Sequence, residues 1–323
     1  MLARQLRPKV NHYLLTIEKG EGYDLNRSLF ERLVLKGYPH QRLTQQHRMR
    51  PEISQLIREL TYPDLIDAPT TKNRADLRGV QDNIIFINHD HPEDETPQLA
   101  DRRDMNTTSS KQNSYEVQMV LKILRYLAQQ GYGTEEIVIL TPYLGQLQKL
   151  QMALKKDNDP ILDDLDSYEL VRAGLLTPAT AKMSKRPIRI ATIGKSASLS
   201  HQPPTENLAV DNYQGEEKDI VIVSLTRSNP DHDIGFMSSP ERLNVLLSRA
   251  RNALIMLGNA ETFLKSRKGK GLWTRLFDMF KLKNYLHDGF PVKCERHPDR
   301  IALLREAADF DGKCPGGGCC EPW

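Results

Sequence analysis

Two short stretches place arginines where a helix meets another element, a position suited to binding phosphate. In TQQHRMRP (44–51), Arg48 comes just before a predicted helix, and the beginning of a helix attracts anions. In ERLNVLLSRARNALIMLGN (241–259), Arg249 and Arg251 lie at the end of a predicted helix and before a buried strand. A guanidinium is a rigid fork of donors that matches phosphate oxygens. Taken alone, however, such an arginine pair is more often solvated or paired with neighbouring carboxylates.

A third stretch, VDNYQGEEKDIVIVSLTRS (210–228), runs from polar residues directly into a buried strand. Loops that adjoin the strand ends of a parallel sheet form the crevice where ligands bind. Gln214 and Gly215 would let the backbone approach a phosphate, and Glu216 or Glu217 would accept a hydrogen bond from a sugar hydroxyl. Taken alone, such a stretch is more often an ordinary loop-to-strand turn.

The elements that must position these residues alternate between apolar strands and amphipathic helices. ILTPYLGQLQKL (139–150) shows the pattern, because a strand is followed by Thr-Pro-Tyr and then a helix. This alternation predicts a parallel α/β sheet with helices on both faces. Strands are predicted at 84–88, 137–140, 188–193, 219–225 and 253–258. Helices are predicted from Pro51, at 115–129 with Asn113 or Ser114 as the cap, at 145–156 and at 241–251.

Four motifs in this order resemble those of a known family: QQHRMRP, TPYLGQ, VDNYQGEEKD and LNVLLSRAR. They closely resemble the C-terminal motor domain of the Upf/Dna2-type superfamily 1 helicases, over roughly residues 5–262. The nearest likeness is to NF-X-type zinc-finger helicases. The resemblance implies a RecA-like α/β fold and ATP-dependent work on nucleic acid, with RNA favoured over DNA because the nearest relatives act on RNA.

The resemblance also implies roles for single residues. Arg48 and Arg249 resemble the two arginines that reach the γ-phosphate across a cleft between domains, where they stabilise the charge of phosphoryl transfer. Thr141, Pro142 and Tyr143 resemble a loop that touches the nucleic-acid backbone. The remaining nucleotide contacts that it implies are Gln5, Gln46, Gln214, Gly215, Glu216 or Glu217, and Arg251.

A superfamily 1 motor also needs GxxxxGK[ST] to cradle ATP and an acidic pair to hold Mg²⁺. The sequence contains no such motif, because Gly194-Lys195-Ser196 has Arg189 where the first glycine belongs. We therefore expect the C-terminal half of a longer motor, which shares ATP and Mg²⁺ with a P-loop-containing domain in cis or in trans. The rival interpretation is a non-catalytic nucleic-acid-binding or scaffold module derived from a helicase.

The expected organisation has three parts. Residues 1–23 would be the remnant of a linker from a first motor domain, 24–265 the RecA-like domain, and 266–323 a linker with a partial zinc-binding tail. Within the second part, the polar segment GKSASLSHQPPTENLAV (194–210) separates motifs that adjoin in the family. It is either a surface loop or a translated, unspliced intron, and we favour the intron because its removal restores the family spacing.

All the cysteines lie near the C-terminal end, in CERHP (294–298) and CPGGGCC (314–320). Clustered cysteines in an intracellular chain favour metal ligands over a disulfide framework. One tetrahedral zinc would take its ligands from Cys294, His297, Cys314 and either Cys319 or Cys320. Free thiols in a frayed end are the alternative.

Composition limits the remaining classes of function. The net charge of the 323 residues is +3, which suggests a polyanionic partner only weakly. No apolar run approaches the roughly 18 residues of a membrane span, and the beginning of the chain lacks the apolar core of a secretion signal. We therefore expect a cytoplasmic or nuclear protein without a membrane partner. A fused nuclease is not supported, because no spaced cluster of Asp, Glu and Lys is present.

Overall fold

The computed structural model describes residues 29–95, 111–156, 189–192, 217–294, 297 and 299–311. The chain divides into two compact units, Met1–Thr44 and Gln45–Trp323. The first unit contributes one described helix, α2 (Leu29–Leu35), and the second contains the sheet and all other elements. Among the described residues, no helix is both long and apolar enough to cross a bilayer.

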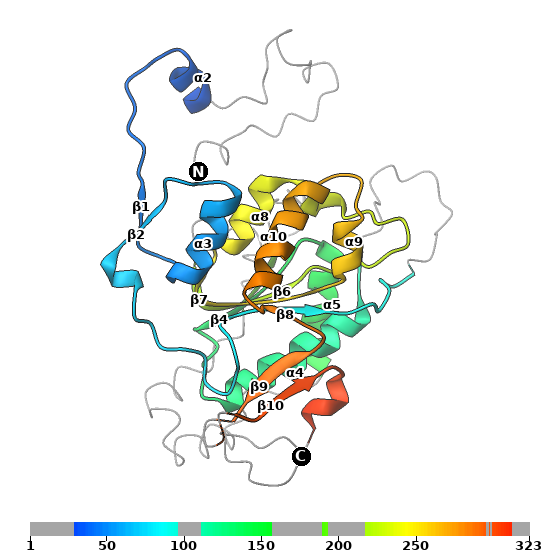
Figure 1. Cartoon of the computed structure of the whole chain (residues 1–323). Coiled ribbons are helices and arrows are strands. Elements are labelled where there is room, and N and C mark those ends of the chain that lie inside the picture. Colours follow the sequence, from blue (N-terminus) through cyan, green and yellow to red (C-terminus); the bar gives the residue numbers. More distant parts are fainter. Residues whose placement is uncertain are drawn as a thin grey trace, which may run out of the picture. The chain divides into compact units, whose positions relative to one another are not determined.

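A six-stranded parallel sheet forms the centre of the second unit (Figure 1). Its order is β5-β4-β6-β7-β3-β8, and every neighbouring pair is parallel. The predicted parallel α/β sheet is thus confirmed. The strands are β3 (Ile84–Asn88), β4 (Ile137–Thr141), β5 (Arg189–Thr192), β6 (Lys218–Ser224), β7 (Ala250–Gly258) and β8 (Leu286–His287).

Helices cover both faces of the sheet, which is why the central residues of its strands are apolar (Figure 1). In β6, Val221 and Val223 pack on one face, while Ile220 and Ile222 pack on the other. The first face carries α3 (Pro51–Leu60), α8 (Pro240–Leu247), α9 (Ala260–Leu264) and α10 (Lys270–Leu282). The second face carries α4 (Ser114–Gln129) and α5 (Leu144–Lys156).

Helices α3 and α4 begin at the residues that local sequence signals predict. The side chain of Asn113 accepts a hydrogen bond from the backbone N–H of Glu116 at 3.1 Å, so Asn113 is the cap of α4. Pro51 occupies the first position of α3, where its missing N–H costs nothing. Both features confirm the sequence prediction.

The expected linker from residue 266 is instead part of the core, and this prediction was wrong. Helix α10 buries four large side chains against the first face of the sheet, and β8 extends the sheet beyond β3. Residues 265–271 are rich in Lys and Gly, which is typical of a linker, although α10 begins among them. The apolar residues of α10 recur at helical spacing. The buried side chains of α10 are Trp273, Leu276, Phe277 and Phe280.

A small antiparallel pair, β9 (Phe290–Lys293) and β10 (Ile301–Leu304), follows β8 and packs on the second face near α4. Phe290 stacks against Phe310 of η3 (Ala307–Phe310), and Tyr126 of α4 contacts both rings. The remaining short elements are β1 (Gln45–Gln46) paired with β2 (Ile66–Asp67), η1 (Pro69–Thr71) and η2 (Gly235–Ser238).

Candidate nucleotide and nucleic-acid interfaces

The predicted site residues separate onto two opposite edges of the sheet. Because all strands are parallel, every strand begins at one edge, here called the amino edge, and finishes at the other, the carboxyl edge. Glu217 and Arg249 immediately precede β6 and β7 and lie at the amino edge, whereas Thr141 is the last residue of β4 and lies at the carboxyl edge. The two kinds of predicted contact therefore fall on different surfaces.

Arg48 reaches the amino edge from the loop between β1 and α3. Its Nη1 donates to the carbonyl oxygen of Ser248 at 3.0 Å, and its Nε forms an ion pair with the carboxylate of Glu217. The side chains of Arg48 and Glu217 are 30% and 38% exposed, so both face solvent while they are paired. The contact with Ser248 brings Arg48 beside the backbone of Arg249, the second predicted phosphate-binding arginine.

Gln46 holds the loop that carries Arg48. Its Oε1 accepts hydrogen bonds from the backbone N–H groups of Arg48 at 2.9 Å and Met49 at 2.8 Å. Its Nε2 donates to the carbonyl of Met49 at 2.8 Å and to Oδ1 of Asp67 at 2.6 Å. The buried amide thus uses its full capacity within the protein. In this structure Gln46 shapes the loop, and its predicted nucleotide contact would require some of these bonds to break.

Asp67 anchors this arrangement from β2. Burial raises the pKa of its carboxyl, but hydrogen bonds from Ser54 and Gln46, together with Arg58, outweigh burial and hold the pKa below its usual value. Ser54 Oγ donates at 2.5 Å, and Arg58 Nη1 lies 2.9 Å from the second carboxylate oxygen. The charged form of Asp67 is therefore the stable one in the fold.

Three further arginines lie at the amino edge. Arg249 is buried between α8 and β7. Arg251 Nε lies 3.6 Å from carboxylate oxygens of both Glu217 and Asp219. Arg74, which the motifs gave no reason to select, donates to the carbonyl of Arg251 at 2.8 Å. Burial and then the positive charge of Arg251 lower the pKa of the Arg74 guanidinium.

The chemistry of the amino edge suits an anion with several oxygens. Glu217, predicted to contact a ribose, forms ion pairs with Arg48 and Arg251 in this structure. A phosphate that approached these arginines would compete with that carboxylate. Seven other predicted site residues lie outside the described residues: Gln5, Gln214, Gly215, Glu216, Cys314, Cys319 and Cys320.

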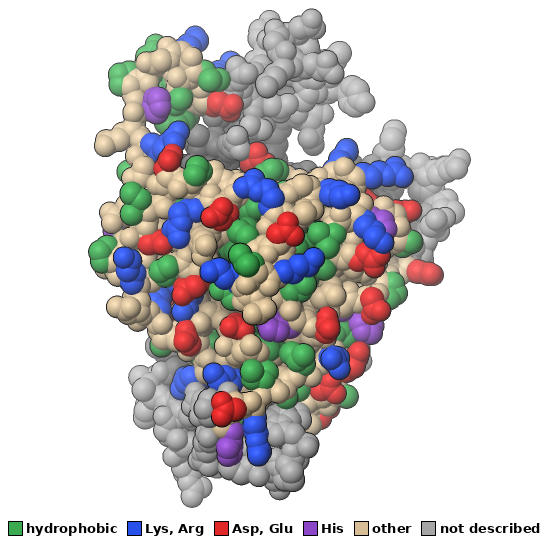
Figure 2. Space-filling model, in the orientation of Figure 1, with side chains coloured by type: hydrophobic (Ala, Val, Ile, Leu, Met, Phe, Trp, Pro, Cys, Tyr) green, Lys and Arg blue, Asp and Glu red, His purple; other side chains and the backbone are tan. Residues whose placement is uncertain are grey.

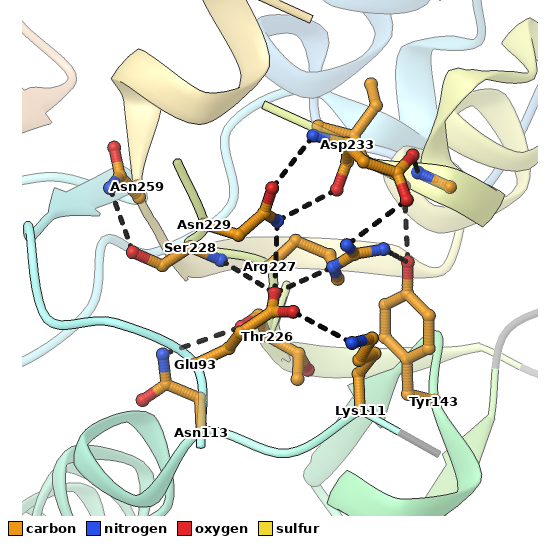
Figure 3. A network of polar contacts seen from close by, with 12 residues as sticks. Glu93, Lys111, Asn113, Tyr143, Thr226, Arg227, Ser228, Asn229, Asp233 and Asn259 are labelled. Atoms are coloured by element: carbon orange, nitrogen blue, oxygen red, sulfur yellow. Dashed lines mark hydrogen bonds and ion pairs between the residues drawn. The ribbon is translucent and has the colours of Figure 1, made fainter. Parts of the chain in front are cut away.

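At the carboxyl edge, Tyr143 of the predicted Thr-Pro-Tyr loop belongs to a network around Arg227 (Figure 3). Arg227 Nε donates to Glu93 at 2.8 Å, and its Nη1 lies 3.4 Å from the hydroxyl of Tyr143. Burial raises the pKa of Tyr143, so its hydroxyl stays neutral and donates to the carbonyl of Ile234 at 3.2 Å. Tyr143 is half-buried, and Thr141 and Pro142 are buried.

A strained residue lies beside this network. Thr226 follows β6 with φ of 71°, which is rare for a β-branched residue. Its N–H donates to both carboxylate oxygens of the buried Glu116 at 2.9 Å, and Ser224 Oγ donates to the same carboxylate at 2.5 Å. Glu116 thereby fixes the backbone from which Arg227 projects. The capping pattern of α4 identified Asn113, but no local signal pointed to Glu116.

Two of the predicted zinc ligands lie together after β9. Cys294 Sγ is 3.7 Å from Nδ1 of His297, and Cys294 is buried. Among the residues that the structure describes, no group of three or more His, Cys, Asp or Glu side chains is arranged to hold a metal. A thiol and an imidazole are the ligand types that zinc prefers, so this pair fits part of a zinc site.

The parallel sheet with helices on both faces and the ordered motifs on its two edges define a RecA-like domain of the helicase type. Comparison with known proteins agrees. The sequence profile of the family described as "AAA domain" matches residues 25–261. The chain therefore belongs to this family, which includes the Upf-type superfamily 1 helicases.

Curated relatives place the chain among helicase proteins. It is 32% identical over 319 residues to mouse NFX1-type zinc finger-containing protein 1, covering 99% of the chain and 14% of that protein. It is 33% identical over 264 residues to the Schizosaccharomyces pombe helicase required for RNAi-mediated heterochromatin assembly 1, covering 81% and 21% respectively. It is 29% identical over 305 residues to Dictyostelium discoideum regulator of nonsense transcripts 1, covering 91% and 18%. The chain thus spans about a fifth or less of these relatives.

Proposed function

We propose that this chain is the C-terminal motor half of an ATP-dependent helicase that acts on RNA in preference to DNA. The observation that carries the proposal is the convergence of Arg48 and Arg251 on Glu217, with Arg48 also bonded to the residue before Arg249. These cations come from distant parts of the sequence and meet at one edge. Arginines so placed stabilise the charge that develops on a transferred phosphoryl group.

The nucleotide would lie between this amino edge and a P-loop-containing domain, in cis or in trans. The guanidinium groups of Arg48, Arg74 and Arg251 at this edge suit a triphosphate. Arg48 and Arg249 would reach its γ-phosphate. Mg²⁺ would be held chiefly by the P-loop domain, where it offsets phosphate charge. Gln5, Gln214, Gly215 and Glu216 remain predicted contacts to the same nucleotide.

Nucleic acid would bind the opposite, carboxyl edge through its phosphates, with Tyr143 as a contact. Such binding depends steeply on salt and little on sequence. RNA is favoured because relatives of the chain are named for nonsense transcripts and for RNAi. We expect the protein in the cytoplasm or the nucleus, where these substrates occur.

The decisive test substitutes Arg249→Ala in the assembly of this chain with a P-loop-containing motor domain. Loss of an arginine finger should lower kcat for ATP hydrolysis by about 10³-fold or more, with RNA affinity unchanged. Arg275→Ala, an exposed arginine on α10, is the matched control and should leave kcat intact. Unchanged hydrolysis by Arg249→Ala would reject the proposal.

A second candidate is a non-catalytic nucleic-acid-binding or scaffold module. The observation that favours it is the lack of GxxxxGK[ST] anywhere in the 323 residues. A scaffold would keep its cellular function and its RNA binding in the Arg249→Ala variant, whereas a motor would lose the function and keep the binding. The same variant therefore separates the two candidates.

The tail would add a zinc-binding module to either candidate. Cys294 and His297 would supply two ligands, and Cys314 with Cys319 or Cys320 the others. The close approach of the Cys294 thiol to the His297 imidazole supports this assignment. Zinc would stabilise the fold of this region, since bound metal contributes directly to folding free energy.

A further inference from the structure

A dense group of cations lies outside both motif-bearing regions. Residues 261–283 contain seven Lys or Arg against two Asp or Glu, whereas the whole chain contains 45 against 42. The densest part is the basic loop, defined as residues 265–270, which joins α9 to α10. Its cations are Lys265, Arg267, Lys268 and Lys270, and all of them are exposed. Figure 2 views the molecule from the side of α9 and α10, where Lys and Arg side chains stand at the surface.

Most of this charge is not neutralised by the described part of the chain. Lys265 forms an ion pair with Glu261 one turn earlier. Among the described residues, no carboxylate forms an ion pair with Arg267, Lys268 or Lys270. Like charges so close in sequence repel one another, so they destabilise the free protein slightly. A polyanionic ligand would remove that repulsion.

The basic loop is held in place rather than extended freely. Ser266 is buried, and its Oγ donates to the carbonyl of Phe263 at 2.8 Å. Gly269 has φ of 86° and lies so close to Ser238 that a Cβ there would meet the Cα of Ser238 at 2.9 Å. Trp273 Nε1 donates to the carbonyl of Met237 at 3.0 Å. These contacts pin the loop against the turn at η2.

The turn at η2 connects the basic loop to the carboxyl edge. The hydroxyl of Tyr143 donates to the carbonyl of Ile234, immediately before η2. Phe236 within η2 is half-buried, and the guanidinium of Arg242 lies over its ring. Tyr143, Phe236 and the basic loop therefore adjoin the same turn.

We propose that the basic loop contacts the phosphates of single-stranded nucleic acid and lengthens the binding path that begins at Tyr143. This inference rests on the proposed nucleic-acid-binding function of the carboxyl edge. Cations that follow a backbone, together with aromatic rings on which bases stack, are the features that bind single strands without regard to sequence. The family motifs do not include these residues, so the loop is an addition to the predicted contacts.

The test compares two matched double variants of the 323-residue chain. Lys268→Gln/Lys270→Gln removes two charges from the basic loop, and Lys281→Gln/Lys283→Gln removes two charges with the same spacing at the far end of α10. All four lysines are exposed, so both variants should unfold at the wild-type temperature. Binding of fluorescent oligouridylate is measured by anisotropy across a series of salt concentrations.

Each lost phosphate contact lowers the slope of log affinity against log salt by about 0.7 for a single strand. The basic-loop variant should therefore lose about 1.4 in slope, which corresponds to roughly 25-fold weaker binding at 0.1 M salt. The control variant should keep the wild-type slope. A wild-type slope in the basic-loop variant, or equal loss in both, would overturn the proposal. If the wild-type chain does not bind oligouridylate, the proposed nucleic-acid binding by the carboxyl edge is rejected, and the role of the basic loop with it.

Discussion

Arg48 donates a hydrogen bond from Nη1 to the carbonyl oxygen of Ser248 at 3.0 Å, although the two residues lie 200 positions apart. The bond joins the loop before α3 to the junction of α8 and β7, which also bears Arg249. Two motifs that look independent in the sequence are thus one surface in the fold. Because Glu217 also pairs with Arg48, the surface carries its own counterion.

Glu217→Gln should raise the affinity of the chain for inorganic tripolyphosphate. The substitution removes the carboxylate that competes for Arg48 and Arg251, and exposed pairs of this kind contribute roughly 0.2–1 kcal/mol. The expected gain is therefore about 1.4- to 5-fold, measured by isothermal titration calorimetry. Asp231→Asn, an exposed carboxylate outside this cluster, is the control. Weaker binding to ATP with unchanged binding to tripolyphosphate would instead support the ribose contact that the sequence predicts.

Asp67→Asn should destabilise the fold at neutral pH by about 1–3 kcal/mol, because it weakens charge-assisted hydrogen bonds to Ser54, Gln46 and Arg58. The folded pKa of Asp67 is depressed, so its contribution is full above the unfolded value near 3.9 and is lost as pH falls through the lower folded value. Urea unfolding at pH 7 and pH 3 measures the difference in the free energy of unfolding between wild type and variant. A difference that is as large at pH 3 as at pH 7 would contradict the assignment.

Trp273→Ala should lower the free energy of unfolding by about 3–5 kcal/mol, because the indole is fully buried between α10 and the sheet. Leu282→Ala, on the same helix but 81% exposed, should change it by less than about 0.5 kcal/mol. Denaturant titration measures both. Near-equal effects would mean that residues after 266 are not part of the core.

Deletion of residues 194–210 should leave the fold intact. β5 finishes at the carboxyl edge and β6 begins at the amino edge with β4 between them, so the connection must cross the sheet diagonally. The residues that remain, 193 and 211–217, reach about 26–29 Å when extended. By the register, the path needs about 20 Å along the strands and about 10 Å across two strand spacings, or about 22 Å in a straight line.

The shorter connection should stabilise the chain by up to about 1 kcal/mol, since closing a shorter loop costs less entropy. Thermal unfolding of the two proteins measures this change. A deletion variant that does not fold would show that the segment is an integral part of the domain and not an expendable insertion.

Zinc analysis of the purified chain should give one metal per molecule, and Cys294→Ser should abolish it. His40→Gln, an exposed histidine outside the proposed ligand set, should retain the metal. Elemental analysis after dialysis, with and without a chelator, measures the stoichiometry. Full zinc content in Cys294→Ser would reject Cys294 as a ligand.

Local sequence signals were sufficient for strands β3 to β7 and for helices α3, α4, α5 and α8. Apolar runs located these strands, and the cap Asn113 and the first-position Pro51 located two helix beginnings. The linker predicted from residue 266 was wrong. The charged residues and glycines of 265–271 suggested a linker, although the apolar residues that follow recur at helical spacing. Glu116, Glu93 and Arg74 were not predicted, since each owes its role to partners that are distant in the sequence.

The sequence by itself determined the alternation of strands and helices and the order of four motifs, because periodicity and motif spacing are properties of neighbouring residues. The tertiary structure decided which edge of the sheet each motif occupies and what each side chain touches. It bonded Gln46 of β1 to the loop that carries Arg48, set Glu217 against two arginines, and brought the basic loop and Tyr143 to one turn. These relationships depend on strand order and register, which form only when residues far apart in the chain pack together.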